Sequence, residues 1–379
     1  METKLIIVGG GAAGIICAIT AKKQNPQLQI TILEQNDRVG KKILKTGNGK
    51  CNISNLNMKE EFYNHPMELR NWQKQLSVNE ILSFFRELGL FLKTDGSTRV
   101  YPYSEQATSV LELLRFELAR LQIEVICNVE VIKMSFIKKW IIETNQRDFE
   151  SDIVVMATGS LAQEKTNGYQ ILSDLGHRVI PLHPGLVAMK TKEKLRNLQG
   201  LRVKCQAQIF DEKNLLHQDI GEILFKEDGL SGILAFDLSR FFTGKNIVSL
   251  DLMYDHPNLE EELNTVFQNK SYYDGLMGIL PKMLVLEILK RVSEPNVKRI
   301  AEIIHNLTFE VIDTYGWDFA QIACGGVNIK DIADDFSSKK QPQLFIVGEL
   351  LDIDGASGGY NLHFAWISGI LAGRAIARF

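Results

Sequence analysis

The chain has 379 residues, of which 45% are hydrophobic and 23% charged, and its formal net charge is -3 at pH 7. This is an ordinary globular composition, and the length allows two or three domains. The slightly acidic balance argues against a nucleic-acid-binding protein, whose affinity rests on a basic face. No apolar run approaches the roughly 18 residues that span a bilayer. The first residues also lack the plan of a signal peptide, so we expect a cytoplasmic protein that does not bind membranes.

The cysteines and histidines indicate neither a metal nor a disulfide framework. The five cysteines are far apart and odd in number, and no CxxC is present. Zinc binding and disulfide bonding are therefore not indicated, and a reducing compartment fits best. The seven histidines form no close pair with metal-ligand spacing, so we expect no metal site.

The N-terminal pattern predicts a βαβ unit. Residues 4–8 are a short apolar run that ends in a glycine cluster, residues 12–25 have helical periodicity, and residues 28–33 form a second apolar run. Short apolar runs of this kind are typical of buried parallel strands. Two amphipathic helices are expected farther on, at about 77–89 and 105–121.

The middle of the chain changes to strand-like sequence. Ser104 is expected to cap the helix that follows it. Residues 123–157 are rich in β-branched residues in short alternating segments, too close together for helices to lie between them. This pattern predicts a strand, a small antiparallel meander and a buried strand.

The remaining sequence predicts an insertion within an α/β domain. Strands are expected at 186–255, helices at 256–305, and then a strand at 343–349 before a final helix. We therefore expect an α/β domain made from both ends of the chain, interrupted by a β region that carries a helical module. The expected domains are 1–185 with 325–379, then 186–255 with 306–324, and the helical insertion 256–305.

The first strand and helix enclose a GxGxxG pattern formed by Gly9, Gly11 and Gly14. These glycines permit a tight turn, close approach of the backbone to a pyrophosphate, and close packing of helix and strand. Glu34 ends the second strand, where a carboxylate holds a ribose hydroxyl, and an acid there favours FAD or NAD over NADP. The residues expected to line this site are Gly9, Gly11, Ala12, Ala13, Gly14, Glu34 and Gln35.

Two later strand ends favour FAD over NAD. One apolar strand ends in Ala157-Thr158-Gly159 after the meander, and another ends in Gly348-Glu349 before a glycine-rich turn and the last helix. Each alone is also typical of an ordinary strand-terminal turn. In this order, after GxGxxG, they resemble the FAD-binding superfamily of the glutathione-reductase type.

This resemblance assigns roles to the second half of the cofactor site. Glu349 would hold the ribitol chain of FAD, and the last helix would point its N-terminus at the pyrimidine edge of the flavin. A reduced flavin carries negative charge there, which a helix N-terminus stabilises. The further cofactor contacts expected are Val131, Ala157, Thr158, Gly159, Gly348, Glu349, Gly359, Tyr360 and Asn361.

The chain is more specifically similar to the YhiN/BaiN-like bacterial flavoproteins, often labelled aminoacetone-oxidase-like oxidoreductases. The segments that carry the likeness fall in family order and cover essentially the whole chain. This resemblance implies non-covalent FAD in a Rossmann-like domain, with an inserted β-barrel-like domain and a small helical insertion. The segments are 40–55, 99–107, 221–232, 324–327 and 348–373.

The chain departs from that family's pattern at four places. Lys226-Glu227 stand where the family usually has Thr-His, and no proline follows Ser231-Gly232. His363 stands for Gln, and Ala323-Cys324 for Thr-Ala. These departures bear on the substrate rather than on the FAD site.

Residues 41–52, KKILKTGNGKCN, crowd lysines and glycines together. Composition alone favours a solvated basic loop. Their place after Glu34 instead favours a segment that folds back along the pyrophosphate toward the flavin, with lysines that neutralise phosphate and glycines that let the backbone approach. The residues expected at the cofactor are Lys41, Lys42, Gly49, Cys51 and Asn52.

Three residues are candidates for chemistry. Cys51 is either a redox-active thiol or a small packing residue or polar contact to the flavin. Cys324 is a second candidate near the ring, and a Cys51–Cys324 pair across the flavin is a speculative extension. His363, in the first turn of the last helix, either bonds flavin or substrate or is simply exposed or packed.

We therefore expect an FAD-dependent oxidoreductase that moves hydride or electrons between a small organic substrate and FAD. No second GxGxxG follows a strand, so NAD(P)H would dock transiently as donor, or oxygen or another molecule would act as acceptor. The alternatives are a flavin-dependent RNA-modifying enzyme and a flavin-binding sensor without turnover. The charge balance favours a small-molecule substrate over a nucleic-acid partner.

Overall fold

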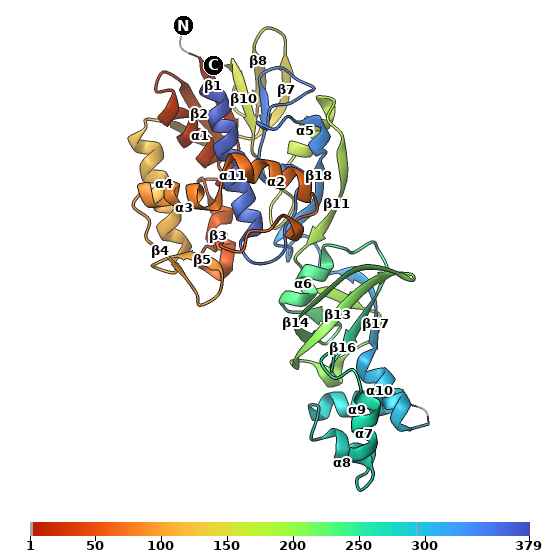
Figure 1. Ribbon diagram of the computed structural model, residues 1–379. Coiled ribbons are helices and arrows are strands. Elements are labelled where there is room, and N and C mark those ends of the chain that lie inside the picture. Colours follow the sequence, from red (N-terminus) through yellow and green to blue (C-terminus); the bar gives the residue numbers. More distant parts are fainter. Residues whose placement is uncertain (1–2, 293) are drawn as a thin grey trace. The chain divides into compact units, whose positions relative to one another are not determined.

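The computed structural model describes residues 3–292 and 294–379. The chain forms two compact units, which Figure 1 shows by colour along the sequence: Met1–His183 with Ile322–Phe379, and Pro184–Gln321. Each unit has its own hydrophobic core. The first unit is thus built from both ends of the chain. The three-part division expected from the sequence is finer than these two units and stays a prediction.

A five-stranded parallel sheet forms the centre of the first unit, in the order β19-β10-β1-β2-β6. The expected βαβ unit and Rossmann-like fold are confirmed, since β1 and β2 pair in parallel on either side of helix α1 in the sequence. The strands are β1 (Lys4–Val8), β2 (Gln29–Glu34), β6 (Glu124–Cys127), β10 (Ile153–Met156) and β19 (Leu344–Ile346).

Helix α1 (Ala12–Gln24) packs closely against the last helix, α11 (Tyr360–Ile376). A Cβ atom added at Gly369 would lie 2.5 Å from the carbonyl oxygen of Ala13. Only glycine therefore allows the two backbones to approach this closely. The contact brings the N-terminal half of the chain against its C-terminal end.

Helix α4 (Ala107–Arg120) precedes the edge strand β6. The expected cap at Ser104 is wrong: the N-cap is Gln106, and the Ser104 hydroxyl accepts a hydrogen bond from the Gln106 N–H at 3.3 Å. The reason is the turn at Glu105, whose φ of 52° separates Ser104 from the helix start.

The rest of the first unit surrounds this sheet. A three-stranded meander follows β6, as expected, and two small sheets, β3-β5-β4 and β11-β18, complete the unit. The elements are the 3-10 helices η1 (Lys41–Gly49), η2 (Glu60–Phe62), η4 (Ile329–Asp331) and η5 (Gly348–Leu350); α2 (Pro66–Gln75), α3 (Val78–Glu87) and α5 (Gly168–Asp174); β3 (Ser54–Asn55), β4 (Leu92–Thr94), β5 (Arg99–Pro102), β7 (Val131–Phe136), β8 (Trp140–Thr144), β9 (Phe149–Ser151), β11 (Val179–Gly185) and β18 (Ile322–Val327).

The second unit is a closed six-stranded barrel in the order β12-β15-β14-β13-β16-β17. Four helices lie between β16 and β17 in the sequence, so the expected barrel with a helical module is confirmed. The elements are β12 (Met189–Thr191), η3 (Arg196–Leu198), β13 (Arg202–Asp211), β14 (Asn214–Lys226), β15 (Gly229–Ser231), α6 (Ile233–Ser239), β16 (Asn246–Asp251), α7 (Leu259–Phe267), α8 (Tyr272–Leu276), α9 (Lys282–Arg291), α10 (Val297–His305) and β17 (Leu307–Thr314).

Within 3–292 and 294–379, no helix combines the length and apolar character needed to cross a membrane. Over the same residues, no three His, Cys, Asp or Glu side chains are grouped so as to hold a metal ion.

Candidate cofactor site

The turn between β1 and α1 forms a cradle with an open front. Gly9 has a φ of 106°, and a Cβ there would lie 2.4 Å from the carbonyl oxygen of Ala157, so the turn requires glycine. A Cβ at Gly11 would instead lie 4.0 Å from the same oxygen, which is the nearest described atom outside its own chain neighbours and the adjoining helix backbone. The space in front of Gly11 is therefore free for a ligand.

The start of α1 supplies donors to that space. Gly11 is its N-cap and, within the described chain, no side chain caps it. The first N–H groups of a helix, here those of Ala12, Ala13 and Gly14, have no intrahelical acceptor and carry partial positive charge. This arrangement is suited to a pyrophosphate.

Glu34 is fixed at the end of β2 beside this turn. Its side chain is 6% exposed. One carboxylate oxygen accepts from the Gly10 N–H at 2.8 Å, and the other accepts from the Asn36 N–H and side-chain amide, both at 2.8 Å. A carboxylate accepts about four hydrogen bonds, so capacity remains for a ribose hydroxyl. The neighbouring Gln35 donates its amide to the Lys165 carbonyl at 2.8 Å.

The start of the meander lies against the same strand end. The Val129 N–H donates to the Glu34 carbonyl at 2.9 Å, and the Val131 carbonyl accepts from the Asn167 side chain at 2.7 Å. Contact between Val131 and the cofactor stays a prediction.

The end of β10 supplies a buried hydroxyl. Thr158 follows Ala157, and its Oγ1 atom is buried without a hydrogen-bond partner among the described residues. A Cβ at Gly168 would lie 2.1 Å from this oxygen, so α5 packs directly against it. Gly159, with a φ of 71°, then turns the chain. An unsatisfied buried hydroxyl is costly, and a bound ligand is one way to satisfy it.

Lys42 and Glu349 meet at the site from opposite ends of the chain. The Lys42 ammonium lies 2.5 Å from one Glu349 carboxylate oxygen and 3.4 Å from the Ser160 hydroxyl. The other Glu349 oxygen accepts from the Ala323 N–H at 3.2 Å. Lys41 instead pairs with Asp37 at 2.6 Å. Lys41 and Lys42 were both expected to neutralise phosphate. In the structure only Lys42 contacts Glu349.

A further carboxylate, Glu164, was missed by the sequence analysis. It lies in the loop after β10, and burial raises its pKa. Lys42 and Lys45 act in the opposite direction, while Glu34 and Glu349 raise the pKa further. Glu164 therefore shares the electrostatic environment of both expected cofactor acids. No pattern in the loop sequence marks it.

Residues 41–52 are exposed in the middle and buried at the end. Gly47, Asn48 and Gly49 have φ values of 56°, 53° and 82°, and all three are exposed. Cys51 is fully buried and Asn52 is 7% exposed. The solvated-loop alternative thus describes only the tip of the segment. Its end belongs to the core of the unit.

The thiol environment of Cys51 does not favour a thiolate. Burial raises its pKa to about 12, whereas a redox-active thiol needs a lowered value. Cys324 is 2% exposed, in β18. All five cysteines are free thiols. Proximity of Cys51 or Cys324 to the flavin stays a prediction.

His363 is packed rather than exposed. It is fully buried, and its Nδ1 atom lies 2.8 Å from the Ser54 hydroxyl. Its Nε2 atom has no hydrogen-bond partner among the described residues. Burial lowers the pKa of His363 to about 3, so the imidazole is neutral.

The first polar side chains of α11 mainly form hydrogen bonds to the protein's own backbone. The Asn361 amide bonds both the N–H of Gly355, at 2.8 Å, and its carbonyl, at 2.7 Å. The Tyr360 hydroxyl donates to the Asn57 carbonyl at 3.3 Å. The backbone N–H groups at the helix start are therefore the groups left for a ligand.

Asn52 presents a second unsatisfied atom at this helix start. Its Oδ1 atom is buried without a hydrogen-bond partner in the described chain. A Cβ added at Gly359 would lie 2.8 Å from it. These features together fit an extended dinucleotide such as FAD. They are the open turn, the starts of α1 and α11, Glu34, the Lys42–Glu349 pair, and the unsatisfied atoms of Thr158 and Asn52.

Comparison with known proteins agrees with this geometry. Residues 3–375 match the sequence profile of a family described as HI0933-like protein Rossmann domain. A 3-dehydro-bile acid delta(4,6)-reductase of Clostridium scindens is 36% identical over 98% of both chains. A ribosomal RNA dihydrouridine synthase of Haemophilus influenzae is 27% identical over 98% of both chains.

Two solved structures share the fold. A 3-ketosteroid delta1-dehydrogenase from Sterolibacterium denitrificans has a TM-score of 0.51 at 12% identity, covering 100% of both chains. A 3-ketosteroid-delta4-(5alpha)-dehydrogenase from Rhodococcus jostii has a TM-score of 0.50 at 12% identity, covering 99% of this chain and 97% of that one. At this identity the likeness shows the architecture alone.

Proposed function

The chain belongs to the HI0933-like family of FAD-binding flavin oxidoreductases, and we propose that it is a reductase of carbon–carbon double bonds conjugated to a carbonyl group. The proposed substrate is a small organic molecule, and the proposed electron donor is NAD(P)H. We propose further that neither a nucleic acid nor a membrane is its partner.

The observation that carries this proposal is a chemical step shared by the names of two full-length relatives. A delta(4,6)-reductase of a 3-dehydro bile acid saturates double bonds near a ketone. A dihydrouridine synthase saturates the uracil double bond that is conjugated to a carbonyl. The two substrates differ in size and polarity, so the common element is the reaction.

The first unit has the groups that such a reaction requires of the protein. Bound FAD would supply hydride chemistry, which the side chains cannot. The start of α1 and Glu34 would hold its pyrophosphate and ribose, and Glu349, oriented by Lys42, its ribitol chain. The N–H groups at the start of α11 would stabilise negative charge on the flavin. We propose that these groups would fix the orientation of the cofactor before any substrate binds.

The small-molecule substrate is supported by the 36% identity to the bile acid reductase and by charge. Acidic residues outnumber basic ones in the inserted unit, and binding to RNA normally draws on a basic surface. No second GxGxxG follows a strand, so NAD(P)H as the proposed donor would dock transiently rather than in a Rossmann domain of its own.

The test is an anaerobic half-reaction experiment on the purified holoenzyme. NADH or NADPH should bleach the visible absorbance of the flavin, a band that belongs to the cofactor. A 3-oxo-4-ene steroid or 2-cyclohexenone should then restore it, and mass spectrometry should show a product heavier by two hydrogens. The saturated ketone is the matched control and should restore nothing. Reoxidation by oxygen alone, with every conjugated ketone inert, would contradict the proposal.

A second candidate function is reduction of uridine in ribosomal RNA, favoured by the 27% identity to the dihydrouridine synthase. The reduced holoenzyme would be incubated with unmodified ribosomal RNA transcripts, followed by nucleoside mass spectrometry. Dihydrouridine above the level given by boiled enzyme would support this function over the small-molecule one.

A further inference from the structure

A cavity of about 330 Å³ opens on the first unit, apart from the cofactor site. It lies between edge strand β6, helix α4 and the chain that follows β2. None of its lining residues is among those expected to contact FAD. Its size is at the lower end of small-molecule sites, which hold about 300–1,000 Å³.

The walls of the cavity are apolar. Val39 and Leu118 are each 3% exposed and Ile123 is 6% exposed, while Val125 is half-buried. All four side chains line the cavity. A ligand that fills it must therefore have a compact apolar body.

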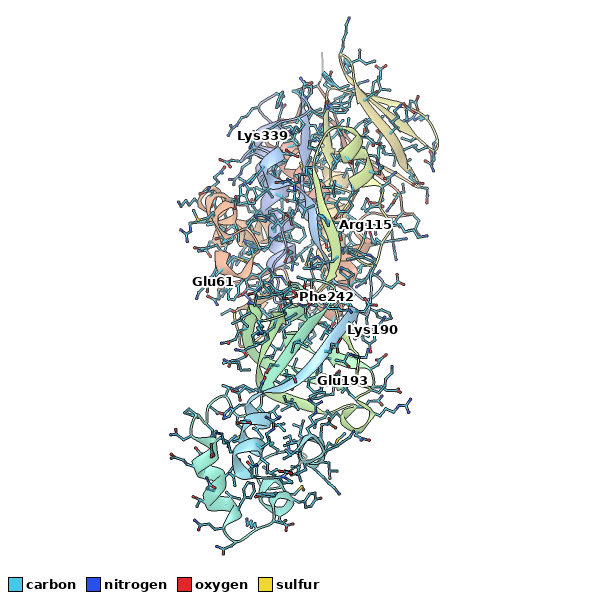
Figure 2. The ribbon with its side chains drawn as sticks, turned by 90° about the vertical axis from the view of Figure 1, so that its right-hand side faces the viewer. Glu61, Arg115, Lys190, Glu193, Phe242 and Lys339 are labelled. Atoms are coloured by element: carbon cyan, nitrogen blue, oxygen red, sulfur yellow. The ribbon has the colours of Figure 1, made fainter. Side chains whose placement is uncertain are left out.

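The rim of the cavity carries an excess of positive charge. Arg38 and Arg115 both line it, and Figure 2 labels Arg115. Arg115 forms an ion pair with Glu112, with 3.0 Å between nitrogen and oxygen. The lining acid Asp37 forms an ion pair with Lys41 at 2.6 Å, so its negative charge is offset. Arg38 is exposed and forms no direct hydrogen bond or ion pair within residues 3–292 and 294–379, although its charge helps to lower the pKa of Asp37. A guanidinium group of this kind matches a carboxylate in shape and charge.

We propose that this cavity binds a monocarboxylate with a compact apolar body. The carboxylate pairs with Arg38 at the rim, with Arg115 beside it, and the apolar body lies against Leu118, Ile123 and Val125. An apolar ligand without the charge leaves Arg38 unpaired, and a small anion without the apolar body leaves the walls in water.

The cavity lies behind the ribose acid. Cys127 lines the cavity and is the register partner of Glu34 in the adjacent strand. A Cβ added at Gly10 would lie 2.3 Å from Val39, another lining residue. The cavity thus adjoins the turn and the strand end that are expected to hold the cofactor.

Cys127 provides a reporter for the test. It is half-buried, whereas the other four cysteines are buried. The neutral reagent N-ethylmaleimide should therefore label Cys127 first in the folded holoenzyme, as peptide mass spectrometry can verify. Octanoate and 2-naphthoate, added at increasing concentration, should slow this labelling in a saturable way. Octanamide, which has the same body without the charge, should protect at least tenfold more weakly.

Two variants make the test specific. Arg38→Ala should weaken protection by octanoate at least tenfold, and Ala119→Trp, which fills the cavity from the exposed side of α4, should abolish it. Arg86→Ala, which removes an exposed arginine outside the cavity, should change nothing. Retained flavin absorbance shows that each variant is folded. Equal protection by octanamide, protection that survives Arg38→Ala, or no protection by either carboxylate would overturn the proposal.

Discussion

Lys42 and Glu349 form an ion pair at 2.5 Å, although 307 residues separate them in the sequence. Their side chains are 27% and 21% exposed. The pair fixes the acid that follows β19 and offsets its negative charge next to the expected path of FAD. It also ties the segment after β2 to the last part of the chain.

Replacement of Lys42 should therefore weaken FAD binding more than replacement of Lys41. Lys42→Ala leaves Glu349 without its cation, and hydrogen bonds to charged groups contribute about 1.5–3 kcal/mol. We expect the dissociation constant of FAD to rise by roughly tenfold to a hundredfold. Lys41→Ala, which loses only a pair with the exposed Asp37, should change it less than about threefold. Fluorescence titration of the apoprotein with FAD measures both, and equal effects would refute the assignment.

Substitution of two glycines in the same turn should affect different properties: stability at Gly9 and FAD binding at Gly11. At Gly9 an added Cβ would collide with the Ala157 carbonyl at 2.4 Å, so Gly9→Ala should lower the free energy of unfolding by at least about 1–3 kcal/mol. At Gly11 the nearest atom is 4.0 Å away, so Gly11→Ala should keep the fold and lose FAD. Thermal unfolding of the apoprotein and the flavin content of the purified protein separate these outcomes. Normal flavin content in Gly11→Ala would show that the pyrophosphate lies elsewhere.

The thiols should not take part in electron transfer. Burial raises the pKa of Cys51 to about 12, so almost no thiolate exists at neutral pH. We expect five titratable thiols in the denatured protein both after air oxidation and after full reduction, because all five cysteines are free in the structure. The loss of two thiols on oxidation, together with a disulfide-linked peptide that contains Cys51 and Cys324, would instead support a redox-active pair.

His363 should make the protein less stable in acid. Burial lowers its pKa to about 3, while an unfolded histidine has a pKa near about 6.5. Between these values the unfolded chain binds the extra proton, so stability is present above about pH 6.5 and is lost as the pH falls toward 3. His363→Gln should flatten this dependence by a few kcal/mol, on the order expected from the shift. Urea unfolding across this range measures it.

The matched control is His256→Gln, which removes an exposed histidine paired with Glu262. Because this side chain is exposed, its loss should change the dependence of stability on pH less than the loss of the buried His363 does. If His363→Gln and His256→Gln behave alike, the buried imidazole is not the source of the acid sensitivity.

The sequence predicted what local sterics dictate. A strand, a glycine turn and a helix in succession define the Gly9–Gly14 turn without reference to the rest of the chain, and Glu34 follows from the length of the next strand. Partner choice was not predictable, because nothing local distinguishes Lys42, which meets Glu349, from Lys41, which meets Asp37.

Burial was the other property that sequence could not supply. The sequence around His363 does not show whether its side chain faces solvent or the core. Its buried side chain contacts Ser54, which lies 309 residues away in the sequence. Ser104 was assigned as a helix cap from residue type alone, and the φ of Glu105 moved the helix start. Glu164 lies in a loop that has no periodicity, so only the folded chain brings it near the charges of Glu34 and Glu349.

Glu164 gives the affinity for FAD a pH dependence of predictable sign. Burial raises the pKa of this carboxyl above its usual value of 4.5, so it ionises at a higher pH than an exposed glutamate. The ionised form adds a negative charge near the carboxylates of Glu34 and Glu349 and near the expected pyrophosphate, which it repels. The dissociation constant of FAD should therefore rise as the pH rises through this raised pKa. Glu164→Gln should bind FAD several-fold more tightly at neutral pH, with a flatter profile. Glu87→Gln, at an exposed position on α3, serves as the control, and an unchanged profile in Glu164→Gln would place its carboxylate outside the cofactor's field.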